Sequence, residues 1–392
     1  MGKLRVLFIT AASVSCAVLI GTSTPIGGVL RGAAYFAAGA SVQELSYDNA
    51  GEDGGSDADV SADDNGTSPE STYTSATVEP PVTESPTETS NDTPAPQRLG
   101  RVINKNRFFS FDDVDYSKYK KNSGEILRYN FGYFDDPNII TLSSGAQVRN
   151  YTDDENSALL AASAVLPELR DMGGFEAGSD EPQVLIYHTH TSESYLPYGD
   201  SYDADYPIRS SDCSKNMTAV GDAICDALAK RGISSVHDCT VYDDPVFTGA
   251  YYRSADMLLE LVEEYPSIKI AIDIHRDGIV NYDGSVTAPI AEINGRTAAQ
   301  FMIITGCDSP ETDFPGYMEN FKLACLLQNC AEKAYPTLAR PIMFDYRNYN
   351  QSLFEGDLLI EVGSQGNSLD EALYTGDLLG DVIADVIERL AE

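Results

Sequence analysis

The fold is decided by two apolar runs that both lead into histidine. Residues 184–195 read VLIYHTHTSESY, and residues 268–278 read IKIAIDIHRDG. A third run, residues 358–363, reads LLIEVG and carries a single carboxylate, Glu361. Continuous apolar runs of this length are typical of strands buried on both faces of a parallel sheet. Because ligands gather outside the carboxyl ends of such strands, we expect the three polar tips to meet at one edge of one sheet.

Helical patterns alternate with these strands along the chain. Amphipathic helices are predicted at residues 216–230, 254–265, 317–335 and 368–390. Further strands are predicted at residues 233–236, 290–293 and 301–304. Ser214 is the expected N-cap of the first helix. Alternating strands and helices predict an α/β fold, a three-layer αβα sandwich with a mostly parallel central sheet.

Two segments precede the folded part. Residues 1–31 start with two basic residues and continue as an apolar run, typical of a cleaved signal peptide or a retained signal-anchor. Residues 32–97 hold 13 acidic residues and neither Lys nor Arg. Such a segment buries too little apolar surface to offset its ordering entropy, so we predict an acidic disordered spacer. Because a spacer is most useful to a tethered protein, we favour a cell-membrane anchor with the catalytic part outside the cytoplasm; cleavage would export it.

The folded part divides near residue 180. Residues 98–180 are weakly patterned, with a strand expected near 139–142 and a helix at 156–170, and form either an N-terminal extension or a small subdomain. Residues 181–392 carry all three motifs and form the predicted catalytic domain.

The net charge argues against nucleic-acid binding, and the cysteine spacing argues against a zinc site held by thiolates. The formal net charge of −35 repels phosphates and argues against a nucleic-acid-binding surface. The seven cysteines contain no C-x-x-C pair, so zinc held by thiolates is not expected. Six cysteines beyond the apolar run permit disulfides without indicating their pairing.

The first motif has the spacing of a metal site. His190 and Glu193 form an H-x-x-E pair, and His275 at a neighbouring strand end supplies a third ligand. Two histidines and a glutamate with an open fourth position are a hydrolytic arrangement of Zn²⁺. Glu361, alone at its strand end, is the expected catalytic base. His188 is an alternative to His190 as ligand; otherwise it supports the site or contacts substrate.

Three further residues near the motifs have open roles. Asp273 falls on the same strand face as His275 and is expected either to orient its imidazole or to cap a turn. Arg276 is either an anchor for a substrate carboxylate or a surface charge. His237 follows a predicted strand and is expected to be a surface histidine.

Together the three motifs resemble the signature of the stage II sporulation protein P family, as does the stretch NYNQSL at residues 348–353. The resemblance covers about residues 140–392. That family is similar to the zinc-dependent N-acetylmuramoyl-L-alanine amidases. The resemblance implies a membrane-anchored hydrolase that acts during engulfment in endospore formation. This hydrolase would cut the amide between N-acetylmuramic acid and L-alanine in peptidoglycan, and also peptide cross-links. Stage II sporulation proteins D and M are the implied partners.

The resemblance places His190 or His188, then Glu193, His275 and Glu361, on motif positions of the family. One feature departs from the wider amidases, which take a glutamate ligand from the start of the first helix. This chain has Ser214-Lys215-Asn216 there, so Glu193 would replace that ligand.

Two other functions fit the same residues. A zinc carboxypeptidase-like peptidase would use the same ligands and would need a cation for a terminal carboxylate, for which Arg209, Arg276 and Arg296 are candidates. A non-catalytic module that binds the wall or a partner would have no need of a base at Glu361.

Overall fold

The computed structural model describes residues 5–11, 14–20, 100–103, 124–153, 160–161, 174–176, 178–197, 199, 201–203, 206–310 and 313–391. The chain divides into two units, residues 40–97 and the remainder. The predicted spacer, residues 32–97, lies outside the described residues. Within the predicted anchor, strands β1 (Arg5–Ala11) and β2 (Val14–Ile20) pair antiparallel. None of the helices in the described ranges is both long and apolar enough to cross a bilayer.

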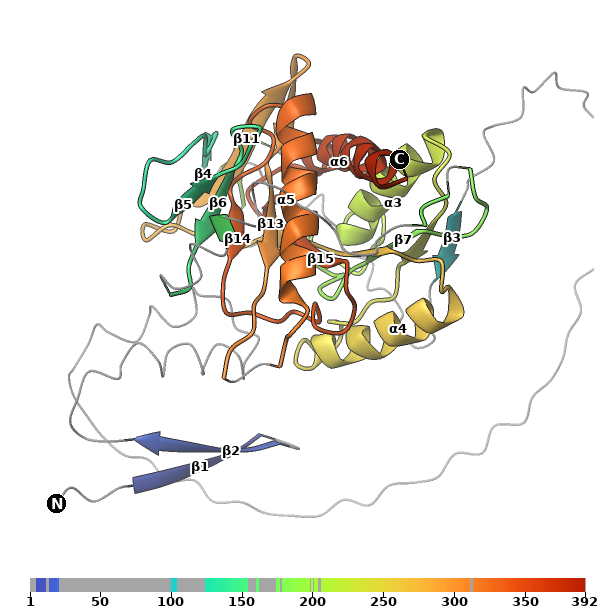
Figure 1. Cartoon of the computed structure of the whole chain (residues 1–392). Coiled ribbons are helices and arrows are strands. Elements are labelled where there is room, and N and C mark those ends of the chain that lie inside the picture. Colours follow the sequence, from blue (N-terminus) through green and yellow to red (C-terminus); the bar gives the residue numbers. More distant parts are fainter. Residues whose placement is uncertain are drawn as a thin grey trace, which may run out of the picture. The chain divides into compact units, whose positions relative to one another are not determined.

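The sheet at the centre of the fold has nine strands (Figure 1). Adjacent strands are parallel except for the β15–β13 and β6–β5 pairs. The prediction of an α/β fold with a mostly parallel central sheet is therefore confirmed. In spatial order the strands are β3 (Gly100–Ile103), β9 (Ser235–Asp238), β7 (Val184–Tyr187), β10 (Ile270–Asp277), β15 (Asp357–Ser364), β13 (Phe301–Thr305), β14 (Ile342–Phe344), β6 (Gln147–Asn150) and β5 (Ile139–Thr141).

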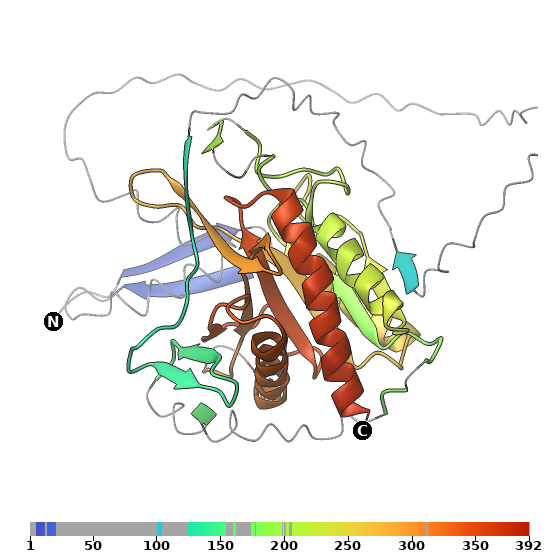
Figure 2. The ribbon, with the colours of Figure 1, turned by 90° about the horizontal axis from the view of Figure 1, so that it is seen from above.

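Helices cover both faces of this sheet because alternate residues of its buried strands point to opposite sides. Ile186 and Ile272 pack in one cluster with residues of α3 (Met217–Lys230), α5 (Tyr317–Ala334) and α6 (Leu369–Leu390). Leu185 and Ala271, one position away, pack with Leu258 and Leu261 of α4 (Ala250–Glu264). Figure 2 shows α6 and α3 side by side along the sheet.

The N-cap of helix α3 differs from the predicted residue. The N-cap of α3 is Asn216, whose side-chain oxygen accepts from the Thr218 amide, and not Ser214. The Ser214 hydroxyl instead donates to Asp212. Helix α6 starts with the reciprocal capping box of Ser368 and Glu371.

A second sheet, of four strands, was not predicted. Its order is β12 (Arg296–Ala299), β11 (Val286–Ile293), β4 (Gly124–Tyr129) and β8 (Ser201–Tyr202). Residues 98–180 thus supply β4 to this sheet, β3 to one edge of the central sheet, and β5 and β6 to the other. Of the helix expected at 156–170, only Leu160 and Ala161 are described, and both are helical.

Candidate functional site

The polar tips of three strands meet at one edge of the central sheet. Strand β10 lies between β7 and β15, and His275 on β10 is directly opposite Glu361 on β15. The chain leaves β7 at His188 and turns, with the Glu193 amide donating to the His190 carbonyl. This turn brings the His190 ring to 5.3 Å from the His275 ring, nearly perpendicular to it. Glu193 Oε2 lies 3.7 Å from His275 Nδ1.

Aromatic rings surround the His190 imidazole. Phe247 stacks on it with ring centroids 4.5 Å apart, and Tyr251 meets it edge-on at 5.4 Å. Its Nδ1 lies 3.7 Å from Asp243 Oδ2 and has no hydrogen-bond partner in the described part of the chain. Burial and the nearby charge of His275 lower the pKa of His190 well below its ordinary value. The ring is therefore neutral, as a metal-binding imidazole must be.

His275 has the opposite electrostatic environment. Its Nε2 lies 2.9 Å from Asp273 Oδ1 as an ion pair that is not aligned as a hydrogen bond. The same Asp273 oxygen accepts from the Thr189 amide, which fixes the carboxylate beneath the β7 turn. Burial alone would lower the pKa of His275, but Asp273, Glu193 and Glu361 outweigh burial and raise it to about 9.

Arg276 organises the loop instead of facing solvent. Its backbone amide donates to Glu193 Oε2, and its guanidinium donates to the carbonyls of Ser194, Ile208 and Asp277. Only 6% of the residue is exposed, which rules out the alternative of a plain surface charge. These bonds engage all three guanidinium nitrogens and hold the side chain in the loop.

Glu361 is half-buried beside a charged pair. Burial, with the negative charge of Asp277 adding to it, raises the pKa of the Glu361 carboxyl to about 8. His275 and, to a smaller extent, Arg340 limit that rise. Arg340 binds Asp277 Oδ2 through both terminal nitrogens at 3.0 Å. One Glu361 oxygen, Oε2, is buried with no hydrogen-bond partner among the described residues. Such a carboxylate is suited to exchanging a proton near neutral pH.

His188 points away from this group. Its Nδ1 lies 3.1 Å from the Ile274 carbonyl and its Nε2 lies 2.9 Å from His237 Nε2, so both ring nitrogens are engaged. His237 is 1% exposed on β9, which overturns the expectation of a surface histidine. The strand starts and ends two residues later than predicted, and this shift brings His237 inside.

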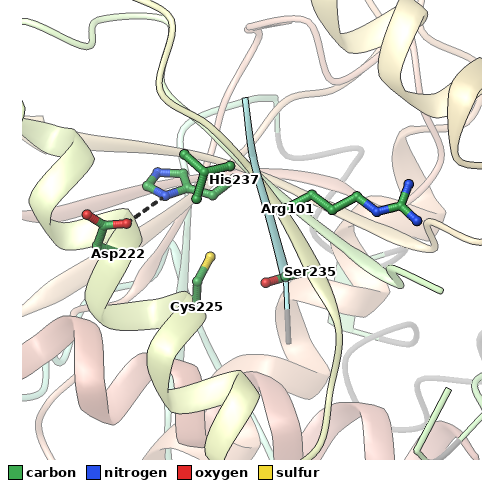
Figure 3. A pocket seen from close by; sticks show the side chains of 7 residues that line it. Arg101, Asp222, Cys225, Ser235 and His237 are labelled. Carbon is green, nitrogen blue, oxygen red and sulfur yellow. Dashed lines mark hydrogen bonds and ion pairs between the residues drawn. The ribbon is translucent and has the colours of Figure 1, made fainter. Parts of the chain in front are cut away.

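His237 also lines a small pocket with Arg101, Ser235 and Cys225 (Figure 3). Its Nδ1 lies 3.2 Å from Asp222 on α3. No residue of this pocket belongs to the group around His190 and His275. The pocket is therefore separate from the candidate site.

The side chains of the site differ from a closed metal site in spacing but resemble one in donor type. Within the described residues, no group of three or more His, Cys, Asp or Glu side chains is close enough to hold an ion as it stands. The 3.7 Å between His275 Nδ1 and Glu193 Oε2 nevertheless approaches the roughly 3.3 Å expected between two ligands of one tetrahedral zinc. His190 faces Asp243, and His275 faces Asp273, with one ring nitrogen each. Metal-ligating histidines almost always donate their other ring N–H to a carboxylate, a backbone carbonyl or water. In donor type the residues fit zinc; His275, whose pKa is raised to about 9, would release a proton on binding the ion.

Several residues at the site could not be identified from the sequence. Asp243 accepts from the Ser192 amide and hydroxyl and from Arg209. Phe247 and Tyr251 supply the rings around His190. None of them belongs to a spaced motif. Asp243 and Phe247 lie in the connection after β9 and Tyr251 lies in the first turn of α4, and this segment returns to the β7 turn. The only sequence signal is the polar, aromatic character of residues 239–251.

Comparisons with known proteins identify the family. The model of the stage II sporulation protein P family matches residues 112–384. The stage II sporulation protein P of Bacillus subtilis (strain 168) is 30% identical over 220 residues, covering 53% of this chain and 51% of that protein. The chain thus matches about half the length of this curated relative.

Among solved structures, the chain is similar to three N-acetylmuramoyl-L-alanine amidases. They are Ami1 of Mycobacterium smegmatis (13% identity, TM-score 0.33, 53% of this chain and 98% of that chain), AmiC2 of Nostoc punctiforme (13%, 0.30, 53% and 96%) and the amidase of Clostridium difficile 630 (14%, 0.30, 54% and 97%). Because these TM-scores are low, the three similarities carry no argument about the reaction. The family match rests instead on more than half of the chain. The chain belongs to the stage II sporulation protein P family.

Proposed function

We propose that this protein is a zinc-dependent peptidoglycan hydrolase that cleaves the amide between N-acetylmuramic acid and L-alanine during endospore formation. The observation that carries the proposal is the meeting of His190, Glu193 and His275 at one sheet edge, with Glu361 opposite His275. Family membership supports the role in sporulation.

His190, Glu193 and His275 would hold the zinc ion. His190 is favoured over His188 because both nitrogens of His188 are already engaged. When bound, zinc polarises an amide carbonyl and lowers the pKa of a water molecule to about 7. Asp243 and Asp273 would orient the two imidazoles through the ring nitrogens that face them.

Glu361 would move the proton in this reaction. Its carboxylate takes a proton from the attacking water as the oxygen adds to the amide carbon. It then delivers that proton to the departing nitrogen of L-alanine as the carbon–nitrogen bond breaks. A carboxyl whose pKa lies near neutral can act in both directions.

The proposal also includes the cellular location of the reaction and the partner proteins. Residues 1–31 would anchor the protein in the cell membrane, residues 32–97 would be the spacer, and the folded part would act outside the cytoplasm. Stage II sporulation proteins D and M are the proposed partners in engulfment, and cleavage of peptide cross-links is a proposed second activity.

Mass spectrometry of peptidoglycan digests tests this function. The full chain should contain one zinc and release stem peptides that begin with a free L-alanine amine. Glu361→Gln should keep the zinc and lose at least about 100-fold in rate, because the proton acceptor is gone. His275→Ala should lose both zinc and activity.

Other products would redirect the assignment. Cleavage only inside the peptides would replace the amidase with a peptidase. A metal-free chain that releases nothing, alone or with its proposed partners, would overturn the hydrolase in favour of a binding module. An active Glu361→Gln variant would refute the role of Glu361.

A further inference from the structure

Arg209 is a cation that is fixed at the site yet open to solvent. Its backbone forms an antiparallel bridge with Glu193, and its Nη1 donates to Asp243 Oδ2 at 2.7 Å. Its guanidinium lies 4.7 Å over the ring of Phe247, the ring that stacks on His190. These contacts hold the side chain in place, although 40% of it is exposed. The second terminal nitrogen, Nη2, forms an ion pair with Glu193 Oε1 at 3.7 Å, which is beyond hydrogen-bond range.

Other arginines are less suited to receive a ligand. Arg276 and Arg340 are buried, the first bound to three carbonyls and the second to a carboxylate. Arg347 is paired with a carboxylate two residues before it. Arg296, on β12, lies over the ring of Tyr374. Of the arginines proposed from sequence as carboxylate anchors, Arg209 is therefore the one with a donor to spare at the site.

The charge around the site makes such a donor necessary for an anionic substrate. Glu193, Asp243, Asp273, Asp277 and Glu361 all lie around the predicted reaction centre. A substrate carboxylate that approached these groups would be repelled unless a cation received it. A guanidinium is the side chain best matched to a carboxylate, because two parallel N–H donors fit its two oxygens.

The proposed substrate presents a carboxylate close to the amide that is cut. In the stem peptide, L-alanine is followed by a D-glutamate linked through its γ-carboxyl, so its α-carboxylate is free one residue beyond the amide to be cut. The L-alanine residue and the Cα of D-glutamate separate that carboxylate from the cut amide, so it lies somewhat farther away than the roughly 3.5 Å that one residue spans. Arg209 is the exposed cation beside the proposed ligands, with its Nη2 3.7 Å from the Glu193 carboxylate.

Resting on the proposed amidase function, we infer that Arg209 binds the free α-carboxylate of the second stem-peptide residue and selects substrates that carry it. A stem peptide whose α-carboxylate is converted to the carboxamide loses the charge and one acceptor. That substrate keeps one oxygen acceptor, but its NH2 group is itself a donor and leaves the second guanidinium donor unpaired in the complex. The enzyme should therefore discriminate between two forms of peptidoglycan that differ in one functional group.

The test compares two substrates with the full chain loaded with zinc. The substrates are N-acetylmuramoyl-L-alanyl-γ-D-glutamyl peptides with either the α-carboxylate or the α-carboxamide. The native protein should cleave the carboxylate form with a kcat/KM roughly 10- to 100-fold higher. Arg209→Gln should bring this ratio close to 1, mainly by slowing the carboxylate substrate. Arg296→Gln, which removes an exposed arginine on β12, should keep the native ratio.

The ratio separates substrate binding from a structural role. If Arg209 only neutralises Asp243, Arg209→Gln will slow both substrates equally and the ratio will survive, which overturns the inference. A native ratio near 1 overturns it as well. Should Arg209→Gln fold poorly, Arg209→Lys keeps the charge without the paired donors and should lower the ratio; an unchanged ratio counts against the inference. If neither substrate is cut at the L-alanine amide, the amidase itself fails, and the inference fails with it.

Discussion

Asp243 accepts hydrogen bonds from both Ser192 and Arg209 and faces His190 with the same carboxylate. A carboxylate behind a metal-binding histidine fixes the ring orientation and raises ligand basicity. Asp243→Asn should therefore weaken zinc binding by roughly 10- to 100-fold. Zinc titration against a competing chelator measures this. Asp256→Asn, an exposed change on α4, is the control, and equal zinc affinity in both variants would rule out the role of Asp243.

Asp357 is a buried carboxyl on β15 whose effect on stability depends on pH. It accepts from the Tyr187 hydroxyl at 2.9 Å, and its other oxygen has no hydrogen-bond partner in the described residues. Burial, with Asp273 nearby, raises the pKa of Asp357 well above its ordinary value. The folded state thus holds this proton more tightly than the unfolded state. That contribution to stability is fully present below the unfolded pKa, about 3.9, and is lost as the pH rises toward the folded pKa.

Asp357→Asn removes this titration and keeps an oxygen for Tyr187. Relative to the native protein, the variant should gain stability as the pH rises from 4 to 7, by about 1.4 kcal/mol per unit of pKa difference traversed. Urea unfolding at several pH values measures the free energy of unfolding of both proteins. A difference that stays constant over this range would show that Asp357 does not titrate differently on folding.

Whether a residue of the candidate site can be predicted from the sequence depends on whether it lies at a strand end or in an irregular connection. His190, Glu193, His275 and Glu361 follow apolar runs, so their convergence could be expected from the shared edge of parallel strands. The prediction that His237 lies at the surface is wrong because β9 is shifted by two residues, which moves His237 from a loop into a buried strand. Asp243 and Arg209 come from irregular connections, whose return to the site depends on tertiary packing and leaves no periodic signal.

At the scale of elements, long apolar periodicity was the reliable signal. Helix α5 was predicted at 317–335 and spans Tyr317–Ala334, and α6 was predicted at 368–390 and spans Leu369–Leu390. The four-stranded sheet was missed because β4 and β11 lie far apart in sequence yet pair in parallel. The antiparallel direction of β13 beside β15 was missed for a similar reason: strand direction depends on the connection, not on the strand's own residues.

The packing of α6 on α3 depends on glycine at position 380. A Cβ there would lie 2.5 Å from the Ala227 Cβ and 2.7 Å from the Ile224 carbonyl oxygen. Alanine usually stabilises a helix relative to glycine by about 0.5–1 kcal/mol. Here the overlap dominates, and Gly380→Ala should lower the free energy of unfolding by roughly 1–3 kcal/mol.

Denaturant unfolding of this variant checks the close approach of the two helices. Gly232→Ala is not a suitable comparison because Gly232 has a φ of +74°. Asp256→Ala on the exposed face of α4 is better, since only intrinsic helix propensity changes there. An increase in stability for Gly380→Ala would mean that α3 and α6 lie farther apart than described.

At the scale of the whole molecule, charge sets how the protein meets its proposed substrate. Residues 98–392 hold 48 of the 61 acidic residues and 23 of the 26 basic ones, so the folded part is strongly negative without the spacer. Peptidoglycan with its wall polymers is also anionic, and like charges slow the encounter of the two. Binding must therefore come from short-range contacts in the site and from the proposed partner proteins.

Moderate salt should consequently speed the reaction on whole sacculi. Raising NaCl from 20 to 150 mM shortens the Debye length to about 8 Å and screens the long-range repulsion. We expect the initial rate at low substrate to rise several-fold, with little change on a small soluble muramoyl peptide that carries few charges. Deleting residues 32–97 removes 13 negative charges and no positive ones, so this variant should respond less to salt. A rate that falls with added salt would instead indicate a local cationic surface that attracts the wall.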